Sequence, residues 1–432
     1  MNRSDELIIA DRARLLGPNV PTFYDDPIHL IKGDGVWVWD VNGRKYLDCY
    51  NNVPHVGHCH AKVVDAISRQ AATLNTHTRY LHEGIVRYVE KLTNTFDDHL
   101  STAIMTCTGS EANDIALRMC ETITGKCGVI ATDHTYHGNT TAVAKLSRTN
   151  APKTGDCSNV RHVPAPDSYR PLGGESGIAH ARAFAEEVQR SIDELENTEH
   201  GFSALIVCPY FVNEGFPNLH NQFLELTEKV VRKAGGLIIA DEVQPGFGRL
   251  GSHMWGHQRA GIQPDIVTLG KPMGNGHPVG GVVTSMDIMT AFRDSFRYFN
   301  TFGGNPVSCA AAEAVLEVLD EEALMKQALD VGNYARSGLK ELALEHECIG
   351  DVRGSGMLFG AEIVLDRHTK QPATAYTKSL VNELRNEGIL LNFLGIHSNT
   401  LKIRPNLQFT CEHADILLNS LDKILKRLKP HP

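Results

Sequence analysis

The chain has 432 residues, of which 42% are hydrophobic and 22% are charged, as in an ordinary globular protein. Its net charge of −9 argues against a nucleic-acid-binding scaffold, which usually carries a basic surplus. The N-terminus has only a short apolar run between charged residues, so it predicts no signal peptide, and no run is long enough to span a membrane. Ten cysteines occur without a C-x-x-C pair, which predicts a reduced, cytoplasmic protein.

In chain order, the expected elements predict an α/β fold. A small antiparallel meander is expected over residues 33–50, where GVWVWD and KYLDCY flank a VNGR turn. Helical spacing is found from Ala112 to Met119 and over 178–195. Continuous apolar runs between such helices predict the strands of a mainly parallel sheet, covered on both faces. These runs are AIMTC (103–107), GVIAT (128–132), ALIVC (204–208), GLIIA (236–240), DIVTL (265–269) and GVVTS (281–285).

The two ends of the chain differ from this middle part. After about residue 310, long helical patterns alternate with few strands, of which MLFGAEIVL is the clearest. We therefore expect a large domain over residues 61–310 and a smaller α+β domain built from residues 1–60 and 311–432. Residues 158–177 are rich in Pro, Gly and Ser and predict a long loop, which is either functional or a plain surface excursion.

Histidines gather in NNVPHVGHCH, residues 51–60. His55, His58 and His60, with Cys59, are ligand types that zinc takes. Ligands so close in sequence need a loop folded tightly on itself, and no second Cys or His cluster completes the set. We therefore predict no metal site, and we expect these histidines to hydrogen-bond within the protein.

The sharpest pair of candidate catalytic residues is Asp241 and Lys271. They follow two expected strands and lie 30 residues apart, the length of one strand–helix–strand unit. In an open α/β sheet, ligands bind outside the carboxyl ends of the strands, so both side chains are expected in one crevice. Pyridoxal 5′-phosphate (PLP) needs a lysine for its Schiff base and an acidic partner for its pyridine nitrogen. Val243, two residues after the aspartate, is expected to pack on the ring face.

A phosphate site is predicted at CTGSEAND, residues 107–114, where a strand runs into a helix. Gly109 lets a phosphate approach the backbone, and Ser110 is the expected N-cap. In DHTYHGNT, just past another strand, Tyr136 is placed to stack on an aromatic cofactor. Nucleotide folds fit less well, because Lys126 and Lys271 are followed by Cys and Pro, not by the Ser or Thr of a P-loop.

The motifs GSEAND, TYHG, ADEVQPGFGR, TLGKPMGNGHPVGG, NTFGGNPVSC and DVRGSGMLFG occur in the order seen in the class III, ornithine-type aminotransferases. The chain resembles this family, whose members are fold-type I PLP enzymes, from about residue 15 to about residue 425. The resemblance implies that Lys271 is the Schiff-base lysine and the general acid and base. It assigns the cofactor contacts to Gly109, Ser110, Tyr136, Asp241, Val243, Gln244, Lys271 and Thr301. Thr301 would reach the cofactor of a neighbouring subunit, which implies a homodimer, or a dimer of dimers, with shared active sites.

One branch of the family matches more closely. NVPHVGHCH, LNTHTRYLH, PDSYR and GKPMGNGHP resemble the phospho-lyases that act on O-phosphoethanolamine and on phosphorylated hydroxylysine. The resemblance implies elimination of phosphate, with an aldehyde and ammonia as the other products. The alternative is an ω-aminotransferase that uses pyruvate or 2-oxoglutarate.

Phospho-lyase chemistry requires a second anion site, for the substrate phosphate. Arginine suits phosphate because its fork is bidentate and permanently charged. The candidates are Arg79 and Arg404, with hydrogen bonds from Tyr50, Asn51 and Arg170. The alternatives are that Arg79 forms a structural ion pair and that Arg404 is the generic carboxylate-binding arginine of transaminases.

The sequence also departs from the wider family. Cys208-Pro209 stands where many class III enzymes have Glu-Pro, and YFVNEGF replaces the usual Gln-Gly-Glu pattern. In transaminases an acid near this place pairs with the substrate-side arginine, which lets one site accept two substrates. This departure weakens the aminotransferase hypothesis.

Overall fold

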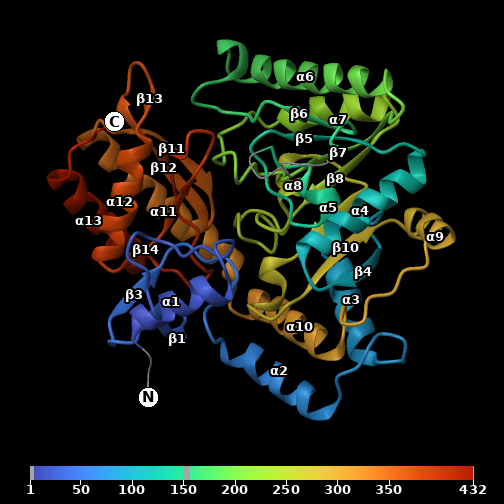
Figure 1. Cartoon of the computed structure of the whole chain (residues 1–432), viewed down its shortest axis with the longest axis horizontal. Coiled ribbons are helices and arrows are strands. Elements are labelled where there is room, and N and C mark those ends of the chain that lie inside the picture. The colour runs from blue at the N-terminus through green and yellow to red at the C-terminus, as the bar shows by residue number, and fades with distance from the viewer. Residues whose placement is uncertain (1–3, 149–155, 432) are drawn as a thin grey trace.

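The computed structural model describes residues 4–148 and 156–431 (Figure 1). Its largest sheet has seven strands in the order β4-β10-β9-β8-β7-β5-β6. Only β10 runs antiparallel to its neighbours, and the other pairings are parallel. The strands are β4 (Thr102–Thr106), β5 (Gly128–Thr132), β6 (Val160–Val163), β7 (Phe202–Val207), β8 (Leu237–Asp241), β9 (Ile266–Leu269) and β10 (Gly280–Thr284). The six expected strands of a mainly parallel sheet are confirmed.

The seventh strand, β6, corrects the prediction of a continuous loop over 158–177. Val160–Val163 pair with β5 at the edge of the sheet, and Leu172–Gly174 form a short 3-10 turn, η1. The tetrapeptide VRHV has buried valines at both ends, but its polar centre and edge position leave it without a continuous apolar signal.

Two layers of helices cover the large sheet, which explains its continuously apolar strands. Ala204 and Ile206 of β7 face the cluster that includes α4 (Gly109–Thr124) and α9 (Met286–Ser295). Leu205 and Val207 point the other way, into the cluster of α6 (Ile178–Glu196) and α7 (Phe223–Lys233). Successive residues of one strand therefore pack on opposite faces of the sheet, and both faces are buried under helices. The shorter helices are α5 (Thr141–Ala144) and α8 (Gly256–Ala260).

The two ends of the chain share a second, four-stranded sheet. The predicted meander is confirmed, and its third strand pairs in parallel with a strand from the C-terminal part. The strands are β1 (Leu30–Asp34), β2 (Trp37–Asp40), β3 (Lys45–Asp48) and β14 (Ile389–Leu390). The long helices α10 (Pro306–Glu321) and α11 (Leu324–Glu345) lead from the large sheet to this region, and α2 (Ala61–Thr73) and α3 (Glu83–Thr93) pack on α10.

A third sheet lies within the C-terminal part, in the order β11-β12-β16-β15, with β13 beside β12. Its strands are β11 (Ile349–Ser355), β12 (Leu358–Asp366), β13 (Gln371–Pro372), β15 (Asn392–Leu394) and β16 (Thr400–Lys402), and the helices around it are α12 (Thr374–Asn386) and α13 (Cys411–Arg427). The expected strand MLFGAEIVL is β12. Isolated pairing of Phe359 with Ile403 extends the sheet toward Arg404.

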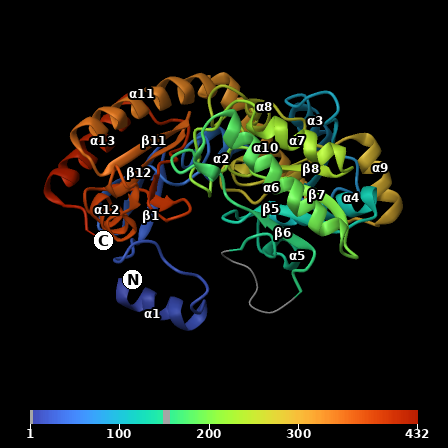
Figure 2. The same ribbon diagram turned by 90° about the horizontal axis from the view of Figure 1, so that it is seen from above.

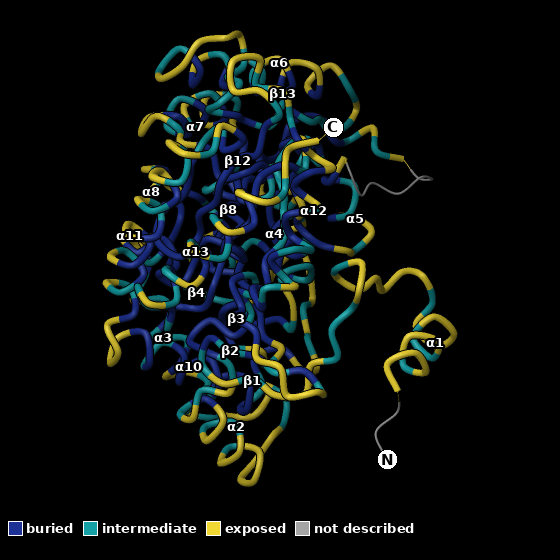
Figure 3. Tube along the Cα trace, turned by 90° about the vertical axis from the view of Figure 1, so that its left-hand side faces the viewer, coloured by how far each residue is buried: buried dark blue, intermediate teal, exposed yellow. Residues whose placement is uncertain are grey.

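The N-terminal helix α1 (Asp5–Leu15) has no buried residue and stands away from the body of the molecule (Figure 3). None of the helices described is both long and apolar enough to cross a membrane. All ten cysteines are free thiols.

Candidate active site

A cavity of about 300 Å³ opens at the carboxyl edge of the large sheet. β8 ends at Asp241, and β9 is followed by Gly270 and Lys271, which begins the short 3-10 turn η2 (Lys271–Gly274). The residue after the lysine, Pro272, fits the first turn of this element, where its missing N–H costs no hydrogen bond. Seven of the residues predicted from sequence line this one cavity: Gly109, Ser110, Tyr136, Asp241, Val243, Gln244 and Lys271.

The buried carboxylate of Asp241 is held by donors from three segments. Its Oδ2 lies 2.6 Å from Nδ1 of His137 and accepts a hydrogen bond of 3.1 Å from the side-chain amide of Asn113. Its Oδ1 accepts from the backbone N–H of Val243 at 3.0 Å. Asn113 is itself fixed, because its Oδ1 accepts from Thr268 of β9 at 2.6 Å. The carboxylate therefore has one orientation at the floor of the cavity.

The amine of Lys271 shares this cavity with Asp241. Its side chain is accessible from the cavity, but protein surrounds it, and this burial lowers the pKa of Lys271. The positive charge of Arg404 lowers the pKa further, while Asp241 opposes the shift. A lysine with a lowered pKa presents more of the neutral amine, which is the form that acts as a nucleophile or a base.

Another wall of the cavity is a cradle made by small residues at the start of α4. A Cβ on Gly109 would lie 2.8 Å from Val243, so only glycine lets the helix approach that side chain. A Cβ on Gly138 would lie 2.5 Å from Oγ of Ser110. The N-cap of α4 is Thr108, whose hydroxyl accepts from the backbone N–H of Glu111 at 3.2 Å, so the prediction of Ser110 as the cap is wrong.

Because Thr108 performs the capping, the hydroxyl of Ser110 lines the cavity and accepts from the backbone N–H of Asn139 at 3.1 Å. Tyr136 also lines the cavity, with its hydroxyl 2.9 Å from Oδ1 of Asn139. The helix start, with its unpaired N–H groups and its dipole, suits a phosphate at this wall.

Two buried cations lie behind another wall of the cavity. Gln244 lines the cavity, and its Oε1 accepts from Nη1 of Arg404 and from Nζ of Lys402, the latter at 3.3 Å. The Nε of Arg404 donates to the backbone carbonyl of Tyr50 at 3.1 Å, and its guanidinium lies 5.1 Å from the Tyr50 ring. Neither cation forms an ion pair with a carboxylate in residues 4–148 and 156–431.

The pKa values of Arg404 and Lys402 are both lowered. Burial lowers the pKa of Arg404 to about 10. Burial also lowers the pKa of Lys402 strongly, and the nearby charges of Arg404 and Lys271 lower it further. An anion bound beside these three basic groups would favour their protonated forms, so this end of the cavity suits an anion.

None of the candidate substrate residues lines this cavity, and Arg404 reaches it only through Gln244. Tyr50 and Asn51 line an adjacent cavity of about 480 Å³ beneath α1. Arg170 does not reach the site: its guanidinium is bound to Glu362 and to the backbone carbonyl of Lys370, so the prediction that it contacts substrate is wrong. Arg79 is exposed and stacks on Phe299 at 3.8 Å, and it forms no ion pair with any described residue.

The histidines of residues 51–60 each contact a different partner. His55 binds the backbone carbonyl of Phe247 at 2.7 Å through Nε2, His58 lies 2.8 Å from Asp48, and His60 lies 2.9 Å from Glu322. The three rings are thus hydrogen-bonding scaffold, as predicted.

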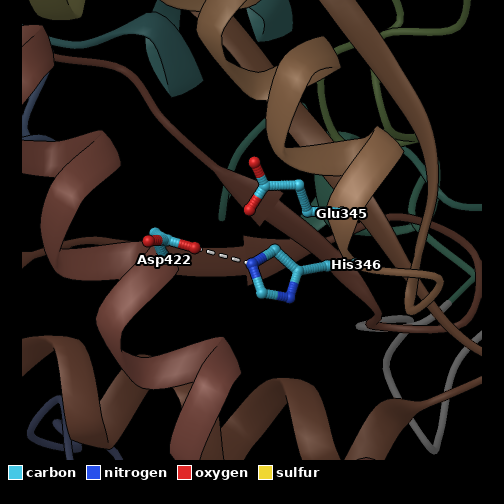
Figure 4. A group of neighbouring side chains, drawn as sticks. All are labelled: Glu345, His346 and Asp422. Atoms are coloured by element: carbon cyan, nitrogen blue, oxygen red, sulfur yellow. Dashed lines mark hydrogen bonds and ion pairs between the residues drawn. The ribbon is translucent and has the colours of Figure 1, made fainter.

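Within the described ranges, one group of side chains has the spacing of a metal site. It comprises Glu345, His346 and Asp422 (Figure 4). Asp422 already accepts from His346 at 2.7 Å and from Lys426 at 2.6 Å, which accounts for the grouping without an ion.

Comparison with known proteins decides the family. The class-III aminotransferase model matches residues 22–425, which is nearly the whole chain. The chain belongs to the class III aminotransferase family. It is therefore a PLP-dependent enzyme with the fold-type I architecture.

Several relatives of known name cover most of this class III chain. A phospholyase from Arthrobacter, solved in complex with phosphoethanolamine, is 43% identical, has a TM-score of 0.94, and the match covers 98% of this chain and all of that one. The ethanolamine-phosphate phospho-lyase homolog 1 of Caenorhabditis elegans is 36% identical over 98% of this chain and 94% of its own. The alanine–glyoxylate aminotransferase 2-like protein of Drosophila melanogaster is 39% identical over 94% of this chain and 84% of its own.

The residues of the cavity fit PLP. Lys271 supplies an accessible amine, Asp241 a fixed carboxylate, and the start of α4 an anion cradle that a Cβ on Gly109 would fill. Three contributors to this class III site were missed from sequence: Asn113, His137 and Lys402. The first two stand inside quoted motifs, and Lys402 is two residues before Arg404, where strand alternation places both on one face.

Cys208 and Glu214 belong to the segment whose sequence departs from the wider class III pattern. Cys208 lines the cavity, and Glu214 is buried with its carboxylate bound to the hydroxyl of Thr132. Burial raises the pKa of Glu214, which favours its neutral form. Glu214 therefore forms no ion pair with Arg404 in the described structure.

Proposed function

We propose that this enzyme is a phospho-lyase that eliminates phosphate from a small phosphorylated amine such as O-phosphoethanolamine. The observation that carries the proposal is the pair of buried cations, Lys402 and Arg404, beside the reactive amine of Lys271. Their protein partners are an amide oxygen, a backbone carbonyl and an aromatic ring, so a substrate dianion would be their first acidic partner among the described residues and would favour their protonated forms. The likeness to the Arthrobacter phospholyase supports the same substrate class.

The roles of the residues follow from their chemistry. Bound PLP supplies an electron sink at the carbon that carries the substrate amine. The neutral amine of Lys271 takes the proton from that carbon. Asp241, fixed by Asn113 and His137, stabilises positive charge at the floor of the cavity.

Release of phosphate completes the reaction. Lys402 and Arg404 hold the phosphate, so the neighbouring C–O bond breaks with its electron pair on the phosphate oxygen, and a C=C bond forms in the remaining amine. That unsaturated amine takes up water and gives an aldehyde and ammonia. One substrate and one water thus give one phosphate, one ammonia and one aldehyde.

The test is an assay without any keto acid. Holoenzyme incubated with O-phosphoethanolamine should release phosphate and ammonia in equal amounts over many turnovers. A single stoichiometric conversion of the cofactor to its amine form, without phosphate, would instead identify a transaminase.

The second candidate is an aminotransferase that passes the amine to pyruvate or 2-oxoglutarate. The similarity to the Drosophila alanine–glyoxylate aminotransferase 2-like protein favours it, and Arg404 could bind the carboxylate of such a keto acid. The buried state of Glu214 argues against it, because no acid in the described part of the chain is paired with Arg404 and could be displaced between two substrates. Keto-acid-dependent turnover of a phosphate-free amine would support this candidate.

The proposal includes a homodimer with shared active sites. Tyr80, Leu81 and Phe302 expose 67%, 105% and 69% of their surface, and they are sequence neighbours of the exposed Arg79 and Thr301. A cluster of large apolar side chains of this kind marks a protein interface. Thr301 does not line the cavity of its own chain, so a role at a cofactor requires a second subunit. Light scattering of the holoenzyme tests the dimer, and Leu81→Glu should dissociate it.

A further inference from the structure

Gln244 stands between the catalytic cavity and the two basic residues Lys402 and Arg404. It lines the cavity, whereas neither basic residue does. Its Oε1 accepts from Nζ of Lys402 at 3.3 Å and from Nη1 of Arg404, so one amide oxygen bonds both groups. An amide oxygen has two lone pairs, and these two donors use both of them. An anion in the cavity therefore meets Gln244 before it meets either basic residue.

The orientation of this amide is fixed by its contacts. Its Nε2 donates to Oδ1 of Asn213 at 3.2 Å. With the amide reversed, its N–H groups would point at the guanidinium of Arg404, which has no acceptor. The oxygen of Gln244 therefore faces the basic residues, and a contact with the cofactor would use the second hydrogen of Nε2.

The contact joins two parts of the fold. Gln244 follows β8 of the large sheet, whereas Lys402 lies in β16, in the sheet that contains β11 and β12 (Figure 2). Asn213, which holds the amide, follows β7. Both amide side chains thus come from connections at the carboxyl edge of the large sheet, where a side chain can change its rotamer while the strands stay in place.

The basic residues have further partners that keep them in position. The Nε of Arg404 donates to the backbone carbonyl of Tyr50 at 3.1 Å, and Nζ of Lys402 lies 5.8 Å from the centre of the Tyr50 ring. Apart from its contacts with these two groups, the side chain of Gln244 has only the hydrogen bond to Asn213, between two neutral groups. The amide is therefore the part of this arrangement that is most easily displaced.

A substrate phosphate and the amide oxygen would compete for the same donors. A hydrogen bond between two charged groups is roughly twice as strong as one between neutral groups, so a phosphate dianion can replace the amide. Burial lowers the pKa values of Lys402 and Arg404, and a bound dianion would favour their protonated forms. The exchange costs the two hydrogen bonds to Gln244, so phosphate is held less tightly than the basic residues alone would hold it.

We propose that Gln244 is an internal competitor of the substrate phosphate: its amide oxygen occupies the place on Lys402 and Arg404 that the phosphate takes, and returns to that place when phosphate leaves. The inference rests on the proposed phospho-lyase function and adds a residue that limits the affinity for the leaving group. A limited affinity serves turnover, because the phosphate that the reaction releases must leave before the next substrate binds.

The test is isothermal titration calorimetry of the holoenzyme with inorganic phosphate. Gln244→Met has a similar size but no acceptor, so phosphate should bind about 10-fold more tightly. Gln244→Glu places a carboxylate on the same donors, so phosphate should bind about 10-fold more weakly. A merely structural role would weaken binding in both variants. The matched controls are Gln263→Met and Gln263→Glu, at an exposed residue that precedes β9 and so lies at the opposite edge of the sheet.

Asn213→Ala tests the same competition from outside the lining of the cavity. It removes the partner of Nε2, so the amide of Gln244 should compete less well and phosphate should bind about 2-fold to 5-fold more tightly. The absorbance of PLP shows whether each variant keeps its cofactor. Asn213→Ala provides the result if a change at Gln244 itself weakens cofactor binding.

Lys402→Met distinguishes the role of Gln244 from the proposed function. If this variant binds phosphate as the wild type does, no phosphate site lies at the basic residues, and both proposals fail. If it loses phosphate binding while the Gln244 and Asn213 variants bind like the wild type, the phospho-lyase proposal stands and the role of Gln244 is overturned. Weaker binding in both Gln244→Met and Gln244→Glu would overturn it as well, whereas opposite shifts support it.

Discussion

The charged side chains at the two ends of the catalytic cavity have different kinds of hydrogen-bond partner. At the cofactor end, the Asp241 carboxylate is surrounded by donors from Asn113, His137 and a backbone N–H. At the substrate end, Lys402 and Arg404 are buried with neutral partners only. The carboxylate at the first end has its hydrogen-bond partners within the chain, whereas the basic groups at the second end have no acidic partner in residues 4–148 and 156–431. The difference teaches that the protein itself holds the carboxylate in place, whereas the proposed phospho-lyase reaction would give the two basic groups their acidic partner.

The most severe change at the cofactor end is Lys271→Ala. It removes the group that takes the proton, so turnover of O-phosphoethanolamine should fall by about 10⁴-fold. Phosphate release measures this loss, and an unchanged melting temperature would show that the fold persists. Lys229→Ala, an exposed lysine paired with Glu225 on α7, is the control and should keep full activity. Substantial turnover by the Lys271→Ala enzyme would reject the catalytic assignment.

Asp241→Asn tests the fixed carboxylate at the same end. The substitution keeps the size of the side chain but removes its charge, so kcat should fall on the order of 10³-fold, the effect of losing a preorganised electrostatic group. Cofactor absorbance shows whether PLP is still held. Asp320→Asn, an exposed position on α10, serves as the control. An enzyme that loses less than tenfold would show that the carboxylate is structural.

Substitutions at the substrate end should reduce activity on a phosphorylated amine more than activity on an amine without phosphate. Lys402→Met and Arg404→Met each keep the volume but remove a buried charge, so kcat/KM for O-phosphoethanolamine should fall by about 10²-fold. Reaction with an amine that lacks phosphate should change much less. Steady-state kinetics on both substrates measures the ratio. Equal losses on the two substrates would mean that these cations do not recognise phosphate.

The cofactor end and the substrate end also differ in how far they could be predicted from the sequence. The large sheet and the residues Gly109, Asp241, Val243 and Lys271 were predictable, because each follows an apolar strand and the carboxyl ends of parallel strands meet at one edge. The support around Asp241 was not, since Asn113 and His137 are distant in sequence and only folding brings them together.

The residues of the substrate end were more difficult to predict from the sequence. Arg404 was selected for its chemistry, but Arg170 has the same chemistry and is bound to Glu362 in a structural network. A sequence shows that a cation exists and not which carboxylate neutralises it. Lys402 was missed for the converse reason, because a lysine is usually solvated and its burial is set by the packing of the C-terminal part.

The smallest predicted effect concerns His55, a buried histidine that belongs to neither end. Its Nδ1 accepts from Arg249 at 3.0 Å and its Nε2 donates to Phe247, so the ring must be neutral. Burial and the charge of Arg249 hold the pKa of His55 well below its usual value. The unfolded chain therefore binds one more proton than the native protein as the pH falls below about 6.5.

The free energy of unfolding should consequently decrease with falling pH in that range, with His55 contributing at most about 1.4 kcal/mol per pH unit. His55→Gln keeps a donor and an acceptor but cannot be protonated, so it should flatten this dependence. Urea denaturation at pH 5.5 and 7.5 measures the slope, with the exposed His368→Gln as control. If the two variants show the same slope, the neutral ring of His55 has no part in the acid sensitivity of the fold.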